Sequence, residues 1–287
     1  MRKKVIVLVT LVVVVIFIIL FTKKVKKRTA FKDYGCDEKC GEDCRCTIPV
    51  GGVVECRSYP RYWISGGDAD ARAQSNNDLL PFVELLLNYV TWGTLFDNTH
   101  KFLWVESKAT PLSGHVRSRN TLQTLGLMEG VNYDWVDGSE FGTTNLNSYT
   151  AIGVASTNTG MLTSDELNAL TARVTDIATF ASHGGGIVAF GEVESSTTAS
   201  PHNGFYYWLP VIVTSSPQIN TSGFTATSEG SAFGLTSTFM NYRHDVIFTN
   251  YDTNVLFAAE EHDSDVTSLM SDPHITENVC LDRNSDF

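Results

Sequence analysis

The sequence predicts a mixed α/β fold, a parallel sheet with helices on both faces, preceded by one N-terminal transmembrane helix. Short, continuous apolar segments such as Lys101–Glu106 and Ile187–Phe190 are typical of parallel strands that are buried on both faces. Segments with an apolar period near 3.6 residues separate them, which indicates strands alternating with helices. Before this pattern comes Val5–Phe21, an apolar run without a charge.

The first part of the body carries the alternating pattern. Leu79–Trp92 is rich in helix formers with helical apolar spacing. A second helix opens with Thr163 or Ser164 as its cap and acids in the first turn, and three glycines end it. The expected elements, in order, are a strand over Tyr62–Ile64, a helix over Leu79–Trp92, a strand over Lys101–Glu106, a helix over Ser118–Leu127, strands over Tyr133–Val136 and Tyr149–Ala155, a helix from Thr163 to His183, and a strand over Ile187–Phe190.

The second part of the body has a different pattern. Short apolar segments alternate there with turns rich in Ser, Thr, Gly and Asn, which indicates shorter strands. The expected strands are Val211–Thr214, Phe224–Thr227, Val246–Thr249 and Val255–Ala259.

Val5–Phe21 is expected to cross a lipid bilayer. At a rise of about 1.5 Å per residue a helix of this length spans roughly 25 Å, at the short end for a hydrocarbon core. No small-x-small cleavage site follows, and the basic segment Lys23–Arg28 comes next, so we expect a retained anchor and not a cleaved signal peptide. The predicted organisation is a tail (1–4), the transmembrane helix (5–21), a basic and Cys-rich stalk (22–57) and one α/β domain (58–287).

Five of the six cysteines lie within 21 residues, and the sixth is near the C-terminus: Cys36, Cys40, Cys44, Cys46, Cys56 and Cys280. Such a cluster indicates disulfides in an oxidising compartment. A zinc site and free thiols are the alternatives, although the spacing lacks paired CxxC motifs. The basic flanks of the anchor slightly favour a cytoplasmic body. The cysteines favour the other side, so we expect a single-pass protein whose C-terminal domain is extracellular or lumenal, at a cell or viral membrane.

Charge is distributed unevenly along the chain. The first 32 residues hold nine of the 21 Lys and Arg and no acid, so the remainder has 12 basic and 32 acidic residues and a net charge of −20. This body repels phosphates, which excludes nucleic acid as a main partner. HExxH, Walker A and GxGxxG motifs are absent from the sequence, so we expect neither a metal nor a cofactor.

A family resemblance rests on the stretch YTAIGVASTNTGMLTSDELNALTARVTDIATFASHGGGIVAFGE, from Tyr149 to Glu192. It resembles the class I glutamine amidotransferase-like superfamily, in particular its ThuA-like members, where a strand, a capped helix and a glycine turn lead into the next core strand. The segments LLLNYVTWGTLFDNTHKFLWVES and FYYWLPVIV are similar to other parts of that family, so the resemblance covers roughly Arg61 to Ala259. It implies a flavodoxin-like sheet.

The catalytic cysteine of that superfamily is missing. The resemblance implies a Cys on a sharp turn after Ile187–Phe190, but Gly191 and Glu192 stand there. Without a nucleophile the chain has no thiol route to ammonia release. The resemblance therefore implies a pseudoenzyme.

Three residues are candidates for other chemistry. Glu192, at the expected elbow, and Glu106, at the end of an expected strand, lie where ligands bind in open α/β sheets, and either is a candidate base or metal ligand. His244 stands beside Asp245, although neighbours in a strand point to opposite faces. Each of the three also has a plain interpretation as a polar structural residue.

Tyr206, Tyr207 and Trp208 form an aromatic group before Pro210. They would make a stacking platform for a sugar or a protein, and core packing explains them equally well. Our first hypothesis is a membrane-anchored, non-enzymatic binding or structural module with a protein or carbohydrate partner. The alternative is a carboxylate- or metal-dependent hydrolase of carbohydrate-like substrates.

Overall fold

The computed structural model describes residues 44–48, 55–58, 60–108, 117–157, 161–191, 205–220, 222–236, 244–271 and 281–282. The candidate anchor Val5–Phe21, the cysteines Cys36, Cys40 and Cys280, and the candidate base Glu192 lie outside these residues. Within the described ranges, no helix has both the length and the apolar character that a membrane span needs.

The chain divides into two compact units. One comprises Met1–Ser58 together with Thr276–Phe287, and the other comprises Tyr59–Ile275. The C-terminal residues therefore group with the Cys-rich segment and not with the α/β domain that precedes them.

The smaller unit contains a three-stranded sheet of order β13-β1-β2. Strand β1 (Cys44–Ile48) pairs antiparallel with β2 (Glu55–Ser58) and parallel with β13 (Leu281–Asp282). The pairing joins residues more than 230 positions apart in the sequence, which short local patterns do not reveal.

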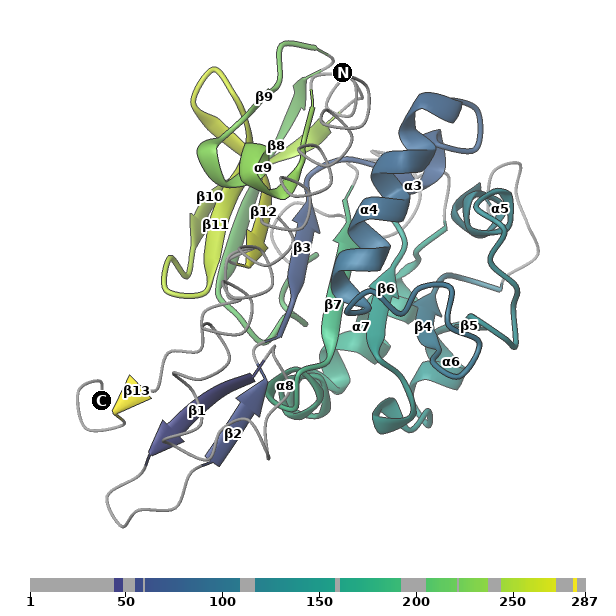
Figure 1. Cartoon of the computed structure of the whole chain (residues 1–287). Coiled ribbons are helices and arrows are strands. Elements are labelled where there is room, and N and C mark those ends of the chain that lie inside the picture. Colours follow the sequence, from purple (N-terminus) through teal and green to yellow (C-terminus); the bar gives the residue numbers. More distant parts are fainter. Residues whose placement is uncertain are drawn as a thin grey trace, which may run out of the picture. The chain divides into compact units, whose positions relative to one another are not determined.

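The larger unit is a mixed α/β domain built on a ten-stranded sheet (Figure 1). One half of the sheet is parallel, with the strands in the order β5-β4-β6-β7-β3. These strands are β3 (Tyr62–Ser65), β4 (Phe102–Val105), β5 (Tyr133–Val136), β6 (Ala151–Val154) and β7 (Gly186–Phe190). All five were predicted from the sequence, with small differences at their ends.

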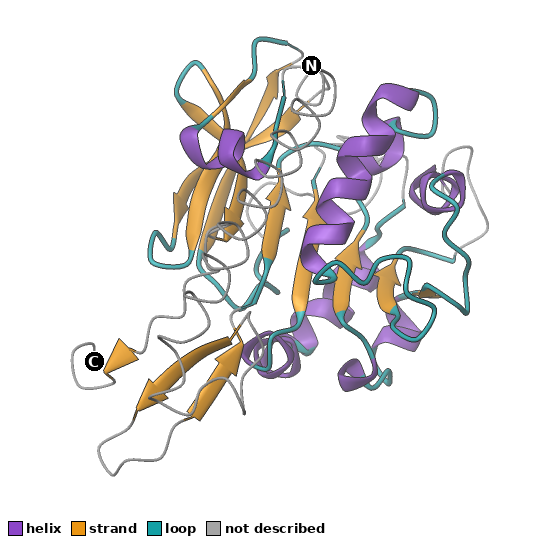
Figure 2. Cartoon of the chain, viewed as in Figure 1, coloured by secondary structure: helices purple, strands orange, loops and turns teal. Residues whose placement is uncertain are grey.

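The other half of the sheet is antiparallel and continues from β3 through β12, β10 and β8. Strand β11 also pairs with β12, and β9 pairs with β11. Its strands are β8 (Val213–Asn220), β9 (Thr225–Ala226), β10 (His244–Tyr251), β11 (Leu256–His262) and β12 (Asp265–Ser271). Figure 2 shows the longer helices around the parallel half, while the short helix α9 (Ser228–Phe233) lies by the antiparallel half.

The order of the parallel strands places a topological switch point between β4 and β6. From β4 the chain moves outward to β5, and from there it crosses back to β6 and on to β7. Numbered in chain order from β3 to β7, the five parallel strands lie in the order 3-2-4-5-1. Ligands of open α/β sheets bind beyond the carboxyl ends of the strands at such a point.

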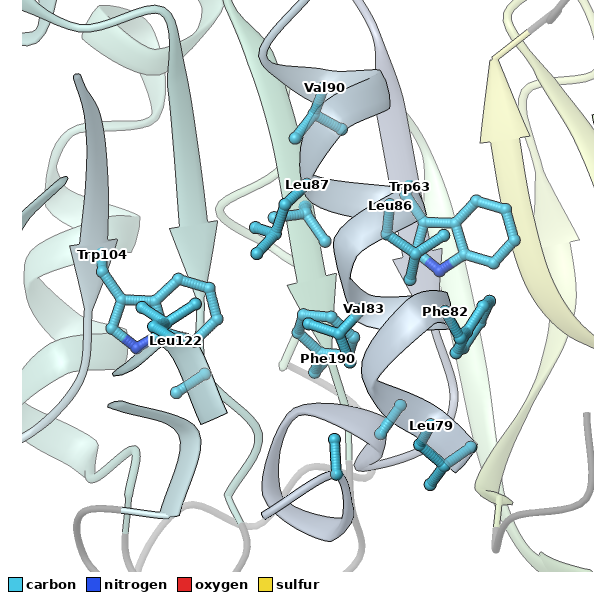
Figure 3. Close-up of a cluster of buried hydrophobic side chains, with 14 of the residues drawn as sticks. Trp63, Leu79, Phe82, Val83, Leu86, Leu87, Val90, Trp104, Leu122 and Phe190 are labelled. Carbon is cyan, nitrogen blue, oxygen red and sulfur yellow. The ribbon is translucent and has the colours of Figure 1, made fainter. Parts of the chain in front are cut away.

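Helices cover both faces of the parallel half. Trp63 and Phe190 point to a core that contains the apolar side of α4, as Figure 3 shows, and Val188 belongs to the same core. The alternate strand residues, among them Ile64 and Ile187, point to a second core formed with α7 and α8. The helices are α3 (Ala69–Arg72), η2 (Asn77–Leu79), α4 (Leu80–Val90), α5 (Arg117–Thr124), α6 (Gly138–Phe141), η3 (Leu146–Ser148), α7 (Ser164–Ala172) and α8 (Val174–Ser182).

The long helix expected from Thr163 to His183 is two helices. Thr163 caps α7 in a capping box with Glu166, as its sequence indicates. The helix ends at Ala172, and the backbone of the next residue, Arg173, leaves the helical region with φ −111° and ψ 20°. The Arg173 guanidinium donates hydrogen bonds to the carbonyl oxygens of Phe141 and Thr144, at 2.6 and 2.7 Å. A tertiary contact thus accompanies the break, which local propensity did not predict.

The antiparallel half differs more from the sequence prediction. Strand β12 was not predicted, and β8 and β10 are longer than the segments expected there. The sequence from Glu260 to Asp265 is rich in acids and would be expected in a solvated loop, yet Glu260 is fully buried within β11. A buried carboxylate needs tertiary partners, which the sequence alone does not show.

Candidate functional site

A buried polar cluster lies at the carboxyl ends of the parallel strands. Glu106 follows β4 directly, Ser156 follows β6, and Asp70 stands in α3 just after β3. Glu106 and Ser156 have no exposed surface, and Asp70 is 1% exposed. Because β4 and β6 flank the switch point, this cluster is the position at which the fold class usually places a ligand site.

Asp70 joins three elements. Its Oδ2 accepts hydrogen bonds from the Ser118 hydroxyl on α5 and from the Ser156 backbone N–H, the latter at 2.8 Å. The Thr121 hydroxyl donates to the Asp70 carbonyl oxygen at 2.7 Å. The Oδ1 atom, also buried, has no hydrogen-bond partner among the described residues. Asp70 thus fixes α5 and the end of β6 to α3 while keeping one acceptor unused.

Glu106 is held by two tryptophans. The Trp104 indole N–H donates to Glu106 Oε2 at 2.8 Å, and the Trp135 indole N–H donates to the Glu106 carbonyl oxygen at 2.9 Å. Within the described part of the chain no donor forms a well-aligned hydrogen bond with its Oε1, and the Ser156 hydroxyl has none either. Weaker contacts from the Arg119 backbone to Glu106 and from the Ser156 hydroxyl to Asp70 still favour the ionised carboxyl groups. Two carboxyl groups and a hydroxyl in this cluster therefore retain hydrogen-bonding capacity.

Burial shifts both carboxyl groups toward their protonated forms. It raises the pKa of Glu106 to about 8, and the charge of Asp70 adds to this effect, while the Trp104 hydrogen bond and the charge of Arg119 oppose it. Burial also raises the pKa of Asp70 to about 6, against the hydrogen bonds from Ser118 and Ser156. Near neutral pH the Glu106 carboxyl is therefore mainly protonated and the Asp70 carboxylate mainly ionised, the arrangement of an acid beside a base.

Two cations lie over the indole of Trp135 beside this cluster. The Arg119 guanidinium carbon is 4.0 Å from the ring centroid, and the Lys108 Nζ is 4.9 Å from it. Lys108 also pairs with Glu140 at 2.6 Å. These contacts fix Trp135, whose indole binds the Glu106 backbone.

The carboxyl end of β7, where the resemblance implies a nucleophile, is packed. The Tyr206 hydroxyl donates to the Ser65 carbonyl oxygen at 2.7 Å. A Cβ atom added to Gly191 would lie 2.3 Å from the Tyr206 Oη. A side chain at position 191 therefore has no room beside Tyr206, and Glu192, the next residue, lies outside the described residues.

The aromatic group divides between core and surface. Tyr206 and Trp208 are 2% and 0% exposed, whereas Tyr207 is 66% exposed. The Tyr206 ring contacts Phe205 and Phe248 with centroid distances of 4.7 and 5.4 Å. Tyr206, Tyr207 and Trp208 thus present no common exposed face, and only Tyr207 offers its ring to solvent.

Replacing Tyr206 by phenylalanine is expected to lower the free energy of unfolding by about 1–2 kcal/mol, because it removes the buried hydrogen bond from the Tyr206 hydroxyl to the Ser65 carbonyl oxygen. The adjacent Tyr207→Phe exchange is the matched control, since that ring is exposed, and its effect should stay within about 0.5 kcal/mol. Urea unfolding followed by circular dichroism measures both. Equal midpoints for the two variants would contradict the role of the Tyr206 hydroxyl.

His244 belongs to a second buried cluster, in the antiparallel half. Its Nε2 lies 3.7 Å from Glu260 Oε2, and this carboxyl oxygen also accepts a hydrogen bond from the Ser268 hydroxyl. Burial lowers the pKa of His244 to about 3 and raises that of Glu260 to about 7. The imidazole is therefore neutral near pH 7 and is a weak base, so the contact with Glu260 is not an ion pair under these conditions.

Asp70, Ser118 and Ser156 were not singled out by the sequence analysis. One signal was available for Asp70, because the reasoning that selected Glu106 applies to an acid that closely follows a buried strand. Ser118 and Ser156 carry no such signal, since serines are common in loops and at helix starts. Across the described ranges, no group of three or more His, Cys, Asp and Glu side chains is arranged to hold a metal.

Comparison with known proteins does not extend these observations. No protein-family model matches the chain. Neither a curated protein nor a solved structure gives a significant match.

Proposed function

We propose that this protein is a non-enzymatic binding or structural module, related in fold to the amidotransferase-like superfamily and held at a membrane surface by Val5–Phe21. Its α/β domain presents an acidic surface to a protein or carbohydrate partner outside the cytosol.

The observation that carries this proposal is the closed carboxyl end of β7. An amidotransferase needs an exposed nucleophile on the turn after this strand. Here the turn begins with Gly191, which packs against the Tyr206 hydroxyl, and Tyr206 is itself tied to Ser65 of β3. The residue that leads into the expected elbow is therefore enclosed by core side chains, which supports a domain without an open site there.

Burial of the acidic pair supports the same proposal. Asp70 connects α3, α5 and the end of β6, and Glu106 connects β4 to Trp135. With 1% and 0% of their surfaces exposed, both residues act as internal connectors of the domain. Polar networks of this kind specify how core elements dock.

A carboxylate-dependent hydrolase is the second candidate, and one observation favours it. Asp70 and Glu106 have pKa values raised to about 6 and about 8, lie beside the switch point and each have one oxygen without a well-aligned hydrogen bond among the described residues. Perturbed carboxyl groups at such a position are typical of acid–base sites. In this alternative Glu106 donates the proton to the leaving group of a carbohydrate-like substrate, and Asp70 acts as the base.

One experiment separates the two candidates. The full-length protein is expressed, its membrane fraction is washed with alkaline carbonate, and the protein extracted in mild detergent is incubated with glutamine and with chromogenic glycosides and esters. The module should stay in the membrane pellet and release neither ammonia nor chromophore above the level of the heat-denatured protein. A form that begins at residue 23 should appear in the soluble fraction.

The control for activity is the Glu106→Gln variant beside Tyr207→Phe, an exchange on the surface. If Glu106→Gln abolishes turnover and Tyr207→Phe retains it, the protein is the hydrolase and the proposal of a non-enzymatic module is wrong. Turnover that both variants retain would contradict both candidates. Release of the full-length protein by carbonate would contradict the membrane anchor.

A further inference from the structure

The sheet of the smaller unit aligns two of the six cysteines. Strands β1 and β2 are antiparallel, and their register places Cys46 directly opposite Cys56. The flanking pairs are Arg45 with Arg57 and Thr47 with Glu55, so the alignment extends on both sides of the cysteine pair.

Directly opposed residues of antiparallel strands are close enough for a disulfide. Their Cα atoms lie about 4.5–5.5 Å apart, within the range of about 4.4–6.8 Å that disulfides span. Directly opposed positions also belong to the same face of the sheet, because faces alternate along a strand with a period of two residues. The backbone register alone therefore places Cys46 and Cys56 at positions whose Cα separation suits a disulfide.

The same register places Cys44 less favourably. Cys44 lies opposite Ser58, so it is a diagonal neighbour of Cys56. Diagonal positions are about 7–8 Å apart, and Cα atoms more than about 7 Å apart are not bridged without backbone movement. Between the two cysteines of β1, the register thus favours Cys46.

We infer that Cys46 and Cys56 form a disulfide that closes the β1–β2 hairpin. The inference concerns the smaller unit and is independent of the function proposed for the α/β domain. It assigns one pair within a cluster that the sequence left open between disulfides, zinc and free thiols.

The reaction is thiol–disulfide exchange with a disulfide donor such as oxidised glutathione or an oxidised thiol oxidoreductase. The thiolate of one cysteine attacks the donor, forms a mixed disulfide and releases the first donor thiol. The thiolate of the second cysteine then attacks the mixed disulfide, forms the Cys46–Cys56 bond and releases the second donor thiol. Two protein thiols are oxidised and one donor disulfide is reduced.

The sequence allows a sharp test by mass spectrometry. Trypsin cleaves after Arg45 and after Arg57, so both cysteines fall in the single peptide CTIPVGGVVECR. The full-length protein is purified under reduction, equilibrated in a mixture of reduced and oxidised glutathione, alkylated and digested. The predominant form of this peptide should be two hydrogen atoms lighter than its reduced form and should carry no alkyl group. Reduction before alkylation should convert it to the doubly alkylated peptide.

Two variants make the assignment specific. Cys44→Ser should leave the lighter peptide in place, and Cys56→Ser should lose it. A Cys46–Arg57 peptide recovered mainly with both thiols alkylated would overturn the inference. So would one linked mainly to the peptide Cys40–Arg45, which contains Cys44, or to the peptide His244–Arg283, which contains Cys280.

Discussion

Replacing Gly186 by alanine is expected to destabilise the α/β domain by about 3 kcal/mol, at the upper end of the usual range for overpacked cores. Gly186 opens β7, and a Cβ atom added there would lie 1.9 Å from the carbonyl oxygen of Val90 at the end of α4. The obstructing atom belongs to the backbone, so no change of rotamer relieves the contact. Helix α4, whose apolar side packs over β7 in Figure 3, has to move away from the sheet.

Chemical unfolding of the full-length protein in detergent, followed by tryptophan fluorescence, measures this loss. Gly142→Ala is the matched control, because Gly142 has an ordinary helical φ of −52° and a Cβ atom added there would lie 3.3 Å from the Ser139 carbonyl oxygen. The control should change the free energy of unfolding by less than about 1 kcal/mol. Similar midpoints for the two variants would show that α4 does not pack on β7 as closely as described.

Replacing Glu106 by glutamine is expected to stabilise the protein increasingly as the pH rises from about 5 to about 8. Burial raises the pKa of Glu106 from 4.5 to about 8, so the folded state keeps a proton that the unfolded state releases. Stability from this group is therefore greatest below pH 4.5 and falls until the pH reaches about 8. The slope is at most about 1.4 kcal/mol per pH unit for one proton. Glutamine stays neutral and keeps an acceptor for the Trp104 indole. The variant therefore does not lose stability at this position as the pH rises.

The measurement is the difference in unfolding free energy between variant and wild type at several pH values. This difference removes the contributions that both proteins share, such as the depressed pKa of His244, which lowers stability below pH 6.5. Glu84→Gln, an exchange at an exposed position of α4, is the control. A difference that stays constant from pH 5 to 8 would show that the Glu106 carboxyl is ionised in the folded protein.

Strand β4 and helix α4 show why part of the fold was predictable. Strand β4 and the body of α4 are continuous in sequence, and their apolar spacing alone gives element type and approximate ends. Helix α7 was equally clear, because Thr163 and Glu166 form a local capping box. The break at Arg173 was not predicted, because carbonyl groups about 30 positions earlier accept hydrogen bonds from its side chain.

The candidate site was predicted in part for a related reason. Glu106 was found because it ends a recognisable strand, and parallel sheets place ligands at that edge. Its partner Asp70 stands 36 positions earlier, and only the docking of α3 beside β4 and β6 brings the two carboxyl groups into electrostatic contact. Tyr206 shows the opposite case, since a cluster of aromatic residues does not indicate which ring is buried.

The sequence by itself determined the features that depend on neighbouring residues: the alternation of strands and helices, the helix caps, the sharp division of charge and the absence of a cysteine after β7. The tertiary structure decided which distant residues meet. It placed β3 at the fifth position of the parallel order, packed Tyr206 onto Gly191, paired Asp70 with Glu106 and aligned Cys46 with Cys56. Local patterns reflect backbone propensity and solvent exposure, whereas these pairings depend on strand order and register, which are set by packing across the whole sheet.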